Sequence, residues 1–473
     1  MSSRNSVVVV GAGPAGLGAA HELIKSDVPV AVLEQHDRVG GICRTVHGDG
    51  YHVDIGGHRF ITKMDEVLDT WKSLLGDDLL LRERMTRIFY RGGLMPYPLQ
   101  IGGTFKTLGL AESMLAVFSY LGAQLRQLPD DSFENWVSNR FGKRVYEHFF
   151  KTYTEKVWGT PCTELSADWA AQRIRSLSLW QAIKDAMHGA FQSDVESEDE
   201  SLLHQFYYPR FGPGMLFEAY ADAVEAGSGE VLTGRQVVRI VHEDGRVREV
   251  ITTGPDGEER HEGESFLSSM PLADLPGVMD PSPPAEVLEA AAGLRHRSFL
   301  TAALLLDEPC TLPDTWIYVH EPSVQMGRVQ NYLNWSPELV EGEGRSCIAA
   351  EYFAWQGDEL WSAADEELID LGRRELTQLE LIDPDSFLDA TVVRIPNAYP
   401  IYDPGYLERI NTIRAWVESF ENLQTIGRSG QHRYINLDFA IVTGVQAARN
   451  IQGEDHDTWL VGTEEEYLEE RPS

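Results

Sequence analysis

The amino-acid sequence predicts an α/β fold in which a second domain is inserted into a domain built on a parallel sheet. Three observations lead to this fold class. Residues 7–33 read as strand, glycine turn, helix and strand. Residues 427–451 form a second glycine-rich segment with a helical pattern, near the end of the chain. A long, aromatic-rich stretch with helical spacing lies between them, so we expect the first and last segments to meet around it.

Each predicted element has a local reason. Val7–Val10 is a short continuous apolar run, as in a strand buried within a parallel sheet. Pro14–Ile24 combines helix-forming residues with an apolar face, and Val28–Leu33 reads as the second strand. Asp244-Gly245 is a hairpin signal between two short strands in Val231–Ile251. The other predictions are helical spacing in Phe105–Gln127 and Phe133–Trp180, an acidic loop at Ser193–Ser201, strands at Ser298–Leu306 and Gln330–Trp335, a helix at Asp365–Leu379 and an acidic tail at Glu464–Ser473.

These elements divide the chain into a discontinuous cofactor domain, two substrate domains and a tail. The predicted boundaries are residues 1–80, 205–270 and 391–455 for the cofactor domain, 81–204 for a helical substrate domain, 271–390 for a sheet-rich substrate domain, and 456–473 for the acidic tail.

Composition and charge argue against several kinds of partner. The 473 residues include 40 Lys+Arg and 74 Asp+Glu, a formal net charge of −34. A chain with this charge is not expected to bind nucleic acid, because phosphates must be neutralised by clustered cations. It is also not expected to be held by charge on an anionic membrane surface. No apolar run reaches the roughly 18 residues of a membrane span. The N-terminus lacks the apolar region of a signal peptide, and the four cysteines form no C-x-x-C pair, so we expect a cytoplasmic protein with reduced thiols and no metal site.

The first glycine turn fits a dinucleotide site of the Rossmann type. Gly11-Ala12-Gly13-Pro14-Ala15-Gly16 matches G-x-G-x-x-G, with a strand before it and a helix after it. Gly11 allows the tight turn, Gly13 lets a pyrophosphate approach the backbone, and Gly16 lets helix and strand pack closely. The helix N-terminus offers N–H groups to the phosphates. Glu34, at the end of the second strand, can accept hydrogen bonds from both ribose hydroxyls.

The residues after Glu34 favour FAD over NAD. Gln35, Arg38, Gly41 and Arg44 lie in QHDRVGGICRT, a second glycine turn with arginines that suits the larger dinucleotide. This stretch resembles the flavoprotein superfamily of amine oxidases, protoporphyrinogen oxidases and UDP-galactopyranose mutases, which implies a glutathione-reductase-like fold for the cofactor domain. The segment from Gly427 to Ile451 resembles the closing motif of that superfamily. By this resemblance, the remaining FAD contacts come from Gly427, Arg428, Asn436, Leu437, Asp438 and, at the adenine, the backbone of Val237.

Further segments resemble the UDP-galactopyranose mutases in particular. They are GYHVDIGGHRFIT at Gly50–Thr62, GGLMPYPLQ at Gly92–Gln100, FENWV at Phe133–Val137 and FKTYTEKVWGTPCTELSADWAAQRI at Phe150–Ile174. The resemblance covers much of the first 180 residues and the last 50, and is weaker between them. It implies pyranose/furanose isomerisation of a nucleotide sugar through N5 of the reduced flavin.

The resemblance also implies roles for single residues. Gly57 and His58 would lie over the flavin near N5. Arg173 would grip the diphosphate of the sugar nucleotide, and Tyr399 and Tyr434 would lie on the phosphate side.

Two departures from the mutase pattern bear on the substrate. Mutases carry a second arginine for the diphosphate on a strand that corresponds to Leu304–Asp307 here. These four residues include no arginine, and Arg328 is the nearest substitute. The closing motif reads Asn436-Leu-Asp438-Phe where mutases tend to have Asn-Gln-Asp-His.

Three readings of the function remain. The first is a mutase acting on a nucleotide sugar or related glycoside, with non-covalent FAD and NAD(P)H as a transient reductant. The second is an FAD-dependent oxidase or dehydrogenase that takes hydride from a small amine or alcohol, for which the aromatic-rich helices would provide an apolar channel. The third is a non-enzymatic flavin protein at a membrane surface, because the stretch Ser113–Leu125 is apolar enough to lie on a bilayer. The sequence leaves the oligomeric state open.

Overall fold

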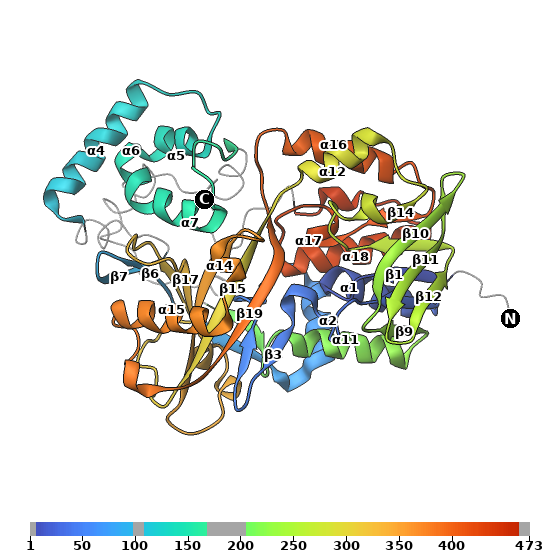
Figure 1. Cartoon of the computed structure of the whole chain (residues 1–473), viewed down its shortest axis with the longest axis horizontal. Helices are drawn as coiled ribbons and strands as arrows, with labels where there is room; N and C mark the ends of the chain where they lie inside the picture. Colours follow the sequence, from blue (N-terminus) through green and yellow to red (C-terminus); the bar gives the residue numbers. More distant parts are fainter. Residues whose placement is uncertain (1–5, 98–107, 168–204, 463–473) are drawn as a thin grey trace.

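The computed structural model describes residues 6–97, 108–167 and 205–462, and two sheets organise it (Figure 1). The first is a five-stranded parallel sheet in the order β20-β13-β1-β2-β9. Its strands are β1 (Val7–Val10), β2 (Val30–Leu33), β9 (Gly229–Leu232), β13 (Ser265–Ser268) and β20 (Leu423–Thr425). Segments from the beginning, middle and end of the chain therefore lie side by side.

Alternate residues of β1 face two different layers. Val7 and Val9 pack on a helical layer, and Val8 and Val10 pack on a β layer. The helical layer consists of α1 (Pro14–Ile24), α2 (Asp65–Leu75), α11 (Gly214–Ala226) and α18 (Leu437–Ile451). The β layer consists of β10 (Gln236–Glu243), β11 (Arg246–Gly254), β12 (Gly257–Glu262) and β14 (Met279–Asp280), with α12 (Ala285–Gly293) and α16 (Tyr406–Val417) beside it.

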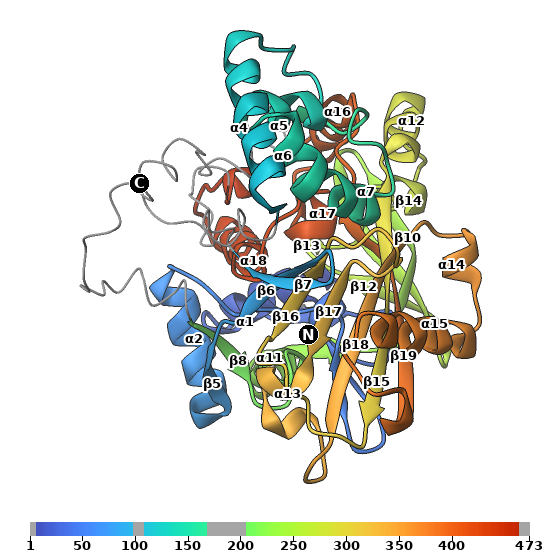
Figure 2. The same cartoon turned by 90° about the vertical axis from the view of Figure 1, so that its left-hand side faces the viewer.

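The second sheet has seven strands in the order β19-β15-β18-β17-β16-β6-β7, which Figure 2 shows face on. Its strands are β6 (Thr86–Tyr90), β7 (Gly93–Pro96), β15 (His296–Leu306), β16 (Trp316–Val319), β17 (Arg328–Asn331), β18 (Ser346–Ala354) and β19 (Phe387–Pro400). One face packs on α15 (Asp365–Gln378). The other face turns toward the helical lobe and the cofactor domain, and this is where the candidate site lies.

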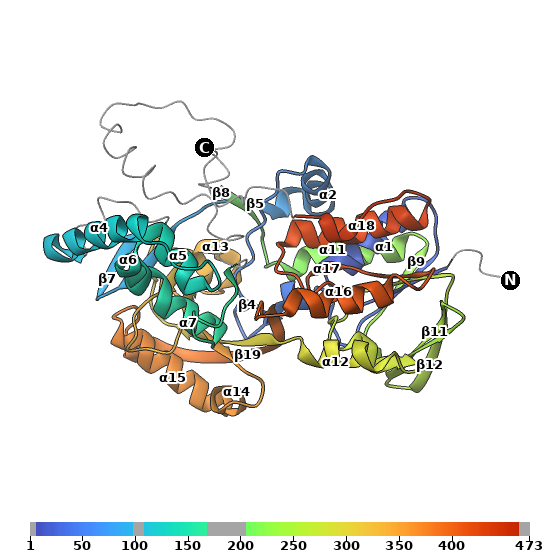
Figure 3. The same cartoon turned by 90° about the horizontal axis from the view of Figure 1, so that it is seen from above.

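The helical lobe stands at one end of the molecule (Figure 3). It contains α4 (Leu110–Leu125), α5 (Phe133–Phe141), α6 (Lys143–Val145), a π turn (Tyr146–Lys151) and α7 (Thr152–Trp158). The remaining elements are a 3₁₀ turn (Gly41–Cys43), β3 (Thr45–His47), β4 (His52–Asp54), β5 (Leu79–Glu83), β8 (Gln205–Pro209), α13 (Tyr332–Trp335), α14 (Glu359–Ser362), α17 (Gly427–Gly430) and five further short 3₁₀ turns.

The structure confirms the predicted fold class, and most predicted elements agree with it. Helix α1 has the predicted bounds. Asp244 and Gly245 both have positive φ, as the turn of a two-residue hairpin requires. The prediction of a strand at Gln330–Trp335 is wrong in its second half. Tyr332–Trp335 forms a helical turn, because this turn carries both aromatic rings into the core, where Trp335 Nε1 donates to the Thr315 carbonyl at 2.7 Å.

The structure does not test the predicted domain boundaries or two of the predicted segments. The domain boundaries stay a prediction, and β6 and β7 of the second sheet fall inside the predicted helical range 81–204. Ser193–Ser201 and Glu464–Ser473 lie outside the described residues. In the described ranges, no helix combines the length and the hydropathy that crossing a membrane demands.

Candidate active site

The first two glycine turns touch each other at the carboxyl end of β1. The N–H of Gly40 donates to the Ala12 carbonyl at 2.8 Å. A Cβ on Gly41 would lie 3.3 Å from Cα of Gly13, and one on Gly16 would lie 1.9 Å from the carbonyl oxygen of Gly11. Glycine at these positions is therefore what allows the close packing that the motif predicts.

The closing segment, Gly427–Ile451, packs against α1 as well. Together with the two glycine turns and Glu34 it forms what we call the cofactor cradle. Gly427 has φ +76°, and a Cβ there would lie 2.7 Å from Cβ of Ala15. A Cβ on Gly444 of α18 would lie 1.9 Å from the carbonyl oxygen of Ala15. The N–H of Gly427 donates to Thr443 Oγ1 at 2.8 Å, which fixes the turn on its helix. The sequence-predicted residues Asn436 and Leu437 lie at the N-cap and first turn of α18, and Asp438 is buried in that turn.

Glu34 is a buried carboxylate at the base of the cradle. Its Oε2 accepts the N–H of Ala12 and its Oε1 accepts the N–H of His36, each at 2.9 Å. A carboxylate offers about four acceptor positions, so both oxygens can still accept further hydrogen bonds. The N–H of Arg235 donates to the Glu34 carbonyl, which brings the start of β10, and with it Val237, to the same end of the sheet.

The cradle fits the adenosine diphosphate half of FAD. Within the described residues, no side chain caps the first turn of α1 and no acidic residue lies in it, so its N–H groups remain available to an anion. Arg44 ends the second glycine turn, and its Nη1 donates to the Gly41 carbonyl at 3.2 Å. Gln35 and Arg38 are exposed, and Arg38 lies 3.7 Å from Glu218, so their proposed contacts stay predictions.

A second group of residues surrounds the Gly56–His58 loop. Gly56 has φ +74°, and a Cβ there would lie 3.1 Å from Phe299 Cζ. A Cβ on Gly57 would lie 2.1 Å from the ring of Trp316. Only a glycine pair can therefore lie this close to the second sheet, and the packing brings His58 to the junction of the two domains.

Asp54 anchors the strand that leads into this loop. The hydroxyl of Tyr208 donates to the Asp54 carboxyl group, and the hydroxyl of Tyr332 donates to the Asp54 carbonyl at 3.0 Å. Burial raises the pKa of Asp54 to about 8. The carboxyl group is thus protonated near neutral pH and serves as a neutral structural partner.

His58 is neutral in this environment. Burial, together with the nearby cations Arg428 and Arg328, lowers its pKa to about 4. Its Nδ1 is buried and has no hydrogen-bond partner in the described part of the chain. The imidazole therefore has an unused polar atom at the domain junction.

Arg328 is the buried cation of the site. Its Nη2 donates to the hydroxyl of Tyr399 at 2.8 Å, and its Nε lies 3.3 Å from Oε2 of Glu351. Its guanidinium also lies over the rings of Trp316 and Phe353, at 5.1 and 4.6 Å from their centroids. Burial raises the pKa of Glu351 while Arg328 lowers it, and neither oxygen of Glu351 accepts a hydrogen bond within the described residues.

The two predicted tyrosines stack beside Arg328. Tyr399 and Tyr434 have ring centroids 5.7 Å apart at an interplanar angle of 18°. The Arg428 guanidinium lies 4.1 Å from the Tyr434 ring and 5.0 Å from the Tyr399 ring, and its Nη2 donates to the Ala398 carbonyl. Trp158 is buried and packs edge-on against both tyrosines.

The structure therefore brings together His58, Arg328, Tyr399, Tyr434 and Arg428, which come from separate parts of the sequence. Arg173 lies outside the described residues, so its predicted role cannot be placed beside them. The sequence analysis missed several members of the site. These are Tyr153, Trp316 and Glu351. A fourth is the buried Arg297, whose guanidinium lies against Gly159. One signal was available, because Glu351 is the single charged residue in the apolar run of β18.

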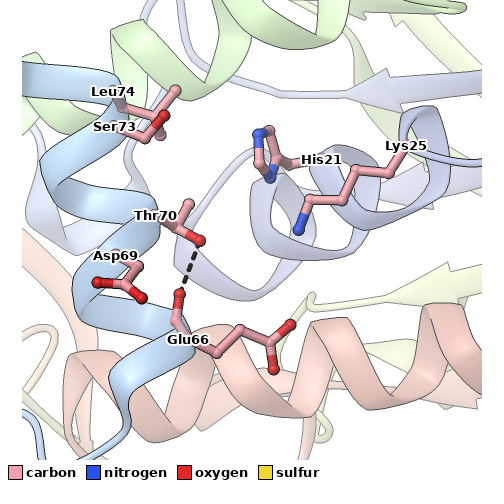
Figure 4. A pocket seen from close by; sticks show the side chains of 7 residues that line it. All are labelled: His21, Lys25, Glu66, Asp69, Thr70, Ser73 and Leu74. Carbon is pink, nitrogen blue, oxygen red and sulfur yellow. Dashed lines mark hydrogen bonds between the residues drawn. The ribbon is translucent and has the colours of Figure 1, made fainter.

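A shallow depression of about 560 Å³ lies elsewhere, between α1 and α2 (Figure 4). Its lining residues are His21, Lys25, Glu66, Asp69, Thr70, Ser73 and Leu74. His21 and Lys25 are on the C-terminal half of α1, away from the glycine turn that begins this helix. This depression is separate from the candidate site.

Comparison with known proteins shows the family of the chain and proteins of the same fold. The family model for flavin containing amine oxidoreductases matches residues 14–452. A crystal structure of reduced UDP-galactopyranose mutase superimposes with a TM-score of 0.83 at 21% identity, covering 97% of this chain and 98% of that one. At this identity the likeness shows the fold alone.

Two curated relatives are oxidases. Coproporphyrinogen III oxidase of Staphylococcus aureus is 21% identical over 95% of this chain and 99% of its own length. Putrescine oxidase of Kocuria rosea is 33% identical, but the alignment spans only 28% of this chain and 31% of the relative.

Proposed function

Because the chain belongs to the flavin containing amine oxidoreductases, and is thus a flavin-dependent enzyme of the oxidoreductase or mutase type, we propose that it is an FAD-dependent mutase of a nucleotide sugar. The observation that carries the proposal is the buried Arg328 with its tyrosine partner, beside Arg428 and opposite the Gly57–His58 loop. The proposed reaction interconverts pyranose and furanose forms.

The charge of this cluster favours an anionic substrate over an amine. Glu351 already faces Arg328, so it is not available to an ammonium group. Arg328 and Arg428 would both repel such a group. A nucleotide sugar carries about two negative charges on its diphosphate, and in a chain of net charge −34 it needs local cations of this kind.

Each residue of the cluster has a definable part. Arg328 and the Tyr399 hydroxyl would bind diphosphate oxygens, because charge-assisted hydrogen bonds to anions are among the strongest in proteins. Arg428 would bind next to them, since its buried Nε has no hydrogen-bond partner in the described part of the chain. His58, neutral and with a free Nδ1, would orient the sugar without adding charge.

The cofactor would be held by the three glycine turns and Glu34. In its reduced form, bound FAD would supply the nucleophile for the anomeric carbon of the sugar. Trp316, Tyr399 and Trp158 form apolar walls that would limit the access of water to this carbon. NAD(P)H is the proposed transient reductant.

The second candidate is an oxidase that acts on a small amine, alcohol or related natural product. The names of the curated relatives favour it, since they are a coproporphyrinogen III oxidase and a putrescine oxidase. So does the number of aromatic side chains on the site face of the second sheet. Tetrapyrrole carboxylates would also be compatible with Arg328, so the charge of the cluster disfavours an amine substrate but does not disfavour a tetrapyrrole.

Equilibrium binding of UDP to the flavin-loaded protein tests the proposal. We expect micromolar binding, detected by titration calorimetry, and a loss of at least tenfold in the variant Arg328→Lys with flavin content unchanged. Arg345→Lys, an arginine near the exposed turn at Gly342, is the matched control. Absence of UDP binding, together with bleaching of the flavin by putrescine or coproporphyrinogen, would establish the oxidase instead.

A further inference from the structure

Glu351 depends on Arg328 for its charge. It lies on β18 with 1% of its surface exposed, and its Oε2 is 3.3 Å from Nε of Arg328, an ion pair without the geometry of a hydrogen bond. Neither of its oxygens accepts a hydrogen bond from a described residue. A buried carboxylate needs both hydrogen-bond donors and a cation to stay ionised at low cost. Before substrate binds, Glu351 therefore keeps its negative charge through Arg328.

The carboxyl group of Glu351 lies between Arg328 and the loop that carries His58. A Cβ on Gly56 in this loop would lie 4.0 Å from Oε1 of Glu351. On the other side, Arg328 donates through Nη2 to the hydroxyl of Tyr399 at 2.8 Å. A ligand held by Arg328 and the Tyr399 hydroxyl would thus be separated from Glu351 by one side chain.

The titratable groups that act on Glu351 come from four elements. They are Arg328 on β17, Asp54 on β4, Tyr332 on α13 and Tyr399 on β19. Burial raises the pKa of Asp54 to about 8, so this acid holds a proton near neutral pH and adds no charge. Burial also raises the pKa of both tyrosines, which stay neutral. Glu351 is therefore the acid of this group that balances Arg328.

Binding of a diphosphate would change this balance. Arg328 and Arg428 supply two positive charges, and a nucleotide sugar brings about two negative charges. His58 adds none, because burial lowers its pKa to about 4. If Glu351 stayed ionised, this group of residues would hold one negative charge in excess, which is costly in a buried site. A proton on Glu351 would remove the excess charge.

We infer that Glu351 is a positioning residue, which holds Arg328 before substrate binds and takes up one proton when the diphosphate of a nucleotide sugar binds to Arg328. The inference rests on the proposed function, because it requires an anionic substrate. The proton comes from the solvent and forms an O–H bond on the carboxyl group, and no electron is transferred. Thr301 stands opposite Glu351 across β15 and β18, and its buried hydroxyl has no hydrogen-bond partner in the described ranges, so the acid gains a polar neighbour.

Proton uptake makes substrate binding depend on pH with a defined sign. A diphosphate on Arg328 opposes the charged form of Glu351, so the pKa of the carboxyl group is higher in the complex than in the free protein. Between these two pKa values, the affinity should fall as pH rises, by up to about tenfold for each pH unit. Below the lower pKa, Glu351 is protonated in both states, and the affinity should be constant and at its highest.

Titration calorimetry with UDP-galactopyranose and the oxidised, FAD-loaded protein tests the inference. This ligand has no group of its own that titrates near neutral pH. At the pH where the affinity changes most steeply, a series of buffers of different ionisation enthalpy should show uptake approaching one proton by the wild type and none by Glu351→Gln. The affinity of Glu351→Gln should be independent of pH and equal to that of the wild type on the acid side. Glu351→Asp, which keeps a carboxyl group, should restore the uptake.

Asp54→Asn is the matched control. It replaces the second buried acid, which already holds its proton near neutral pH, so proton uptake should persist in this variant. Unchanged flavin content and melting temperature would show that the variants fold. The wild type alone gives an independent measurement, because its infrared difference spectrum on binding should contain a new C=O band of a protonated carboxyl group.

The outcomes separate this inference from the proposed function. Binding of UDP-galactopyranose without proton uptake, or without the new infrared band, would overturn the inference and leave the proposed function intact. Uptake that persists in Glu351→Gln would place the proton on another group, such as His58, and would also overturn the inference. Absence of any binding to the wild type would overturn both.

Discussion

Nη2 of Arg328 lies 2.8 Å from the hydroxyl oxygen of Tyr399, although the two residues are 71 positions apart in the sequence. Arg328 begins β17, and Tyr399 lies near the end of β19, with the two strands β18 and β15 between them in the sheet. The two long side chains therefore reach toward each other over the face of the sheet. The contact assembles the centre of the candidate site before any substrate is present.

A double-mutant cycle at Arg328 and Glu351 separates binding from stability. Arg328→Met leaves Glu351 buried without its partner, so we expect it to lower the free energy of unfolding by about 3–5 kcal/mol. The double variant Arg328→Met with Glu351→Gln removes both charges and should recover most of that stability. Both variants should bind UDP more weakly than the wild type, with a loss of about 2–4 kcal/mol in binding free energy. Denaturant unfolding and calorimetry measure the two effects.

Glu351→Gln alone gives the sharpest control in that cycle. It retains the cation and removes its counter-charge, so UDP should bind as tightly as in the wild type or more tightly. Weaker binding in this variant would mean that Glu351, and not Arg328, contacts the ligand.

Replacement of Glu34 should affect both the cofactor and its cradle. Glu34→Ala removes the acceptor for the ribose hydroxyls, and FAD affinity should fall by about 2–4 kcal/mol. The N–H groups of Ala12 and His36 also lose their acceptor, so the melting temperature of the flavin-free protein should fall as well. Asp37→Ala, an exposed neighbour, is the control. Unchanged flavin affinity would mean that the ribose is held by another group.

The sequence and the structure differ in which parts of the site they reveal. The cofactor cradle was predictable, because its glycines and Glu34 occur within one continuous strand–turn–helix–strand unit. The resemblance to the mutases points to Arg328 as the substitute arginine, but the contacts of its side chain are visible only in the structure. Glu351, Trp316 and Tyr153 could not be assigned, because they contribute through pairing between strands and packing of α7 that no local pattern encodes.

The buried histidines predict acid sensitivity. Burial lowers the pKa of His58 and His296 to about 4, and that of His320 and His432 to about 3. Unfolded chains bind these protons below about pH 6.5, while the folded protein does not. The free energy of unfolding should therefore fall as pH drops from about 6.5 to about 4, by about 1.4 kcal/mol per pH unit for each histidine. In His320→Gln, the slope of the unfolding free energy against pH should be smaller by about 1.4 kcal/mol per pH unit, the contribution of one proton. Denaturant unfolding at a series of pH values measures this slope, and an unchanged slope would contradict the lowered pKa of His320.

The flavin should be bound without a covalent link. Cys43 is the thiol that belongs to the glycine turns, and burial raises its pKa, so it is a poor nucleophile. Acid precipitation should release all of the yellow colour into the supernatant as FAD. Flavin that remains with the precipitated chain after this treatment would refute the prediction.

The most direct test of the proposed function compares reduced and oxidised enzyme on one substrate. Dithionite-reduced protein, without oxygen, should convert UDP-galactopyranose to the furanose form with no net oxidation, and Arg328→Lys should abolish the conversion. The oxidised protein in air should give no product and no hydrogen peroxide. Absence of furanose from the reduced enzyme, with hydrogen peroxide formed in air from an amine, an alcohol or coproporphyrinogen, would contradict the mutase and identify an oxidase.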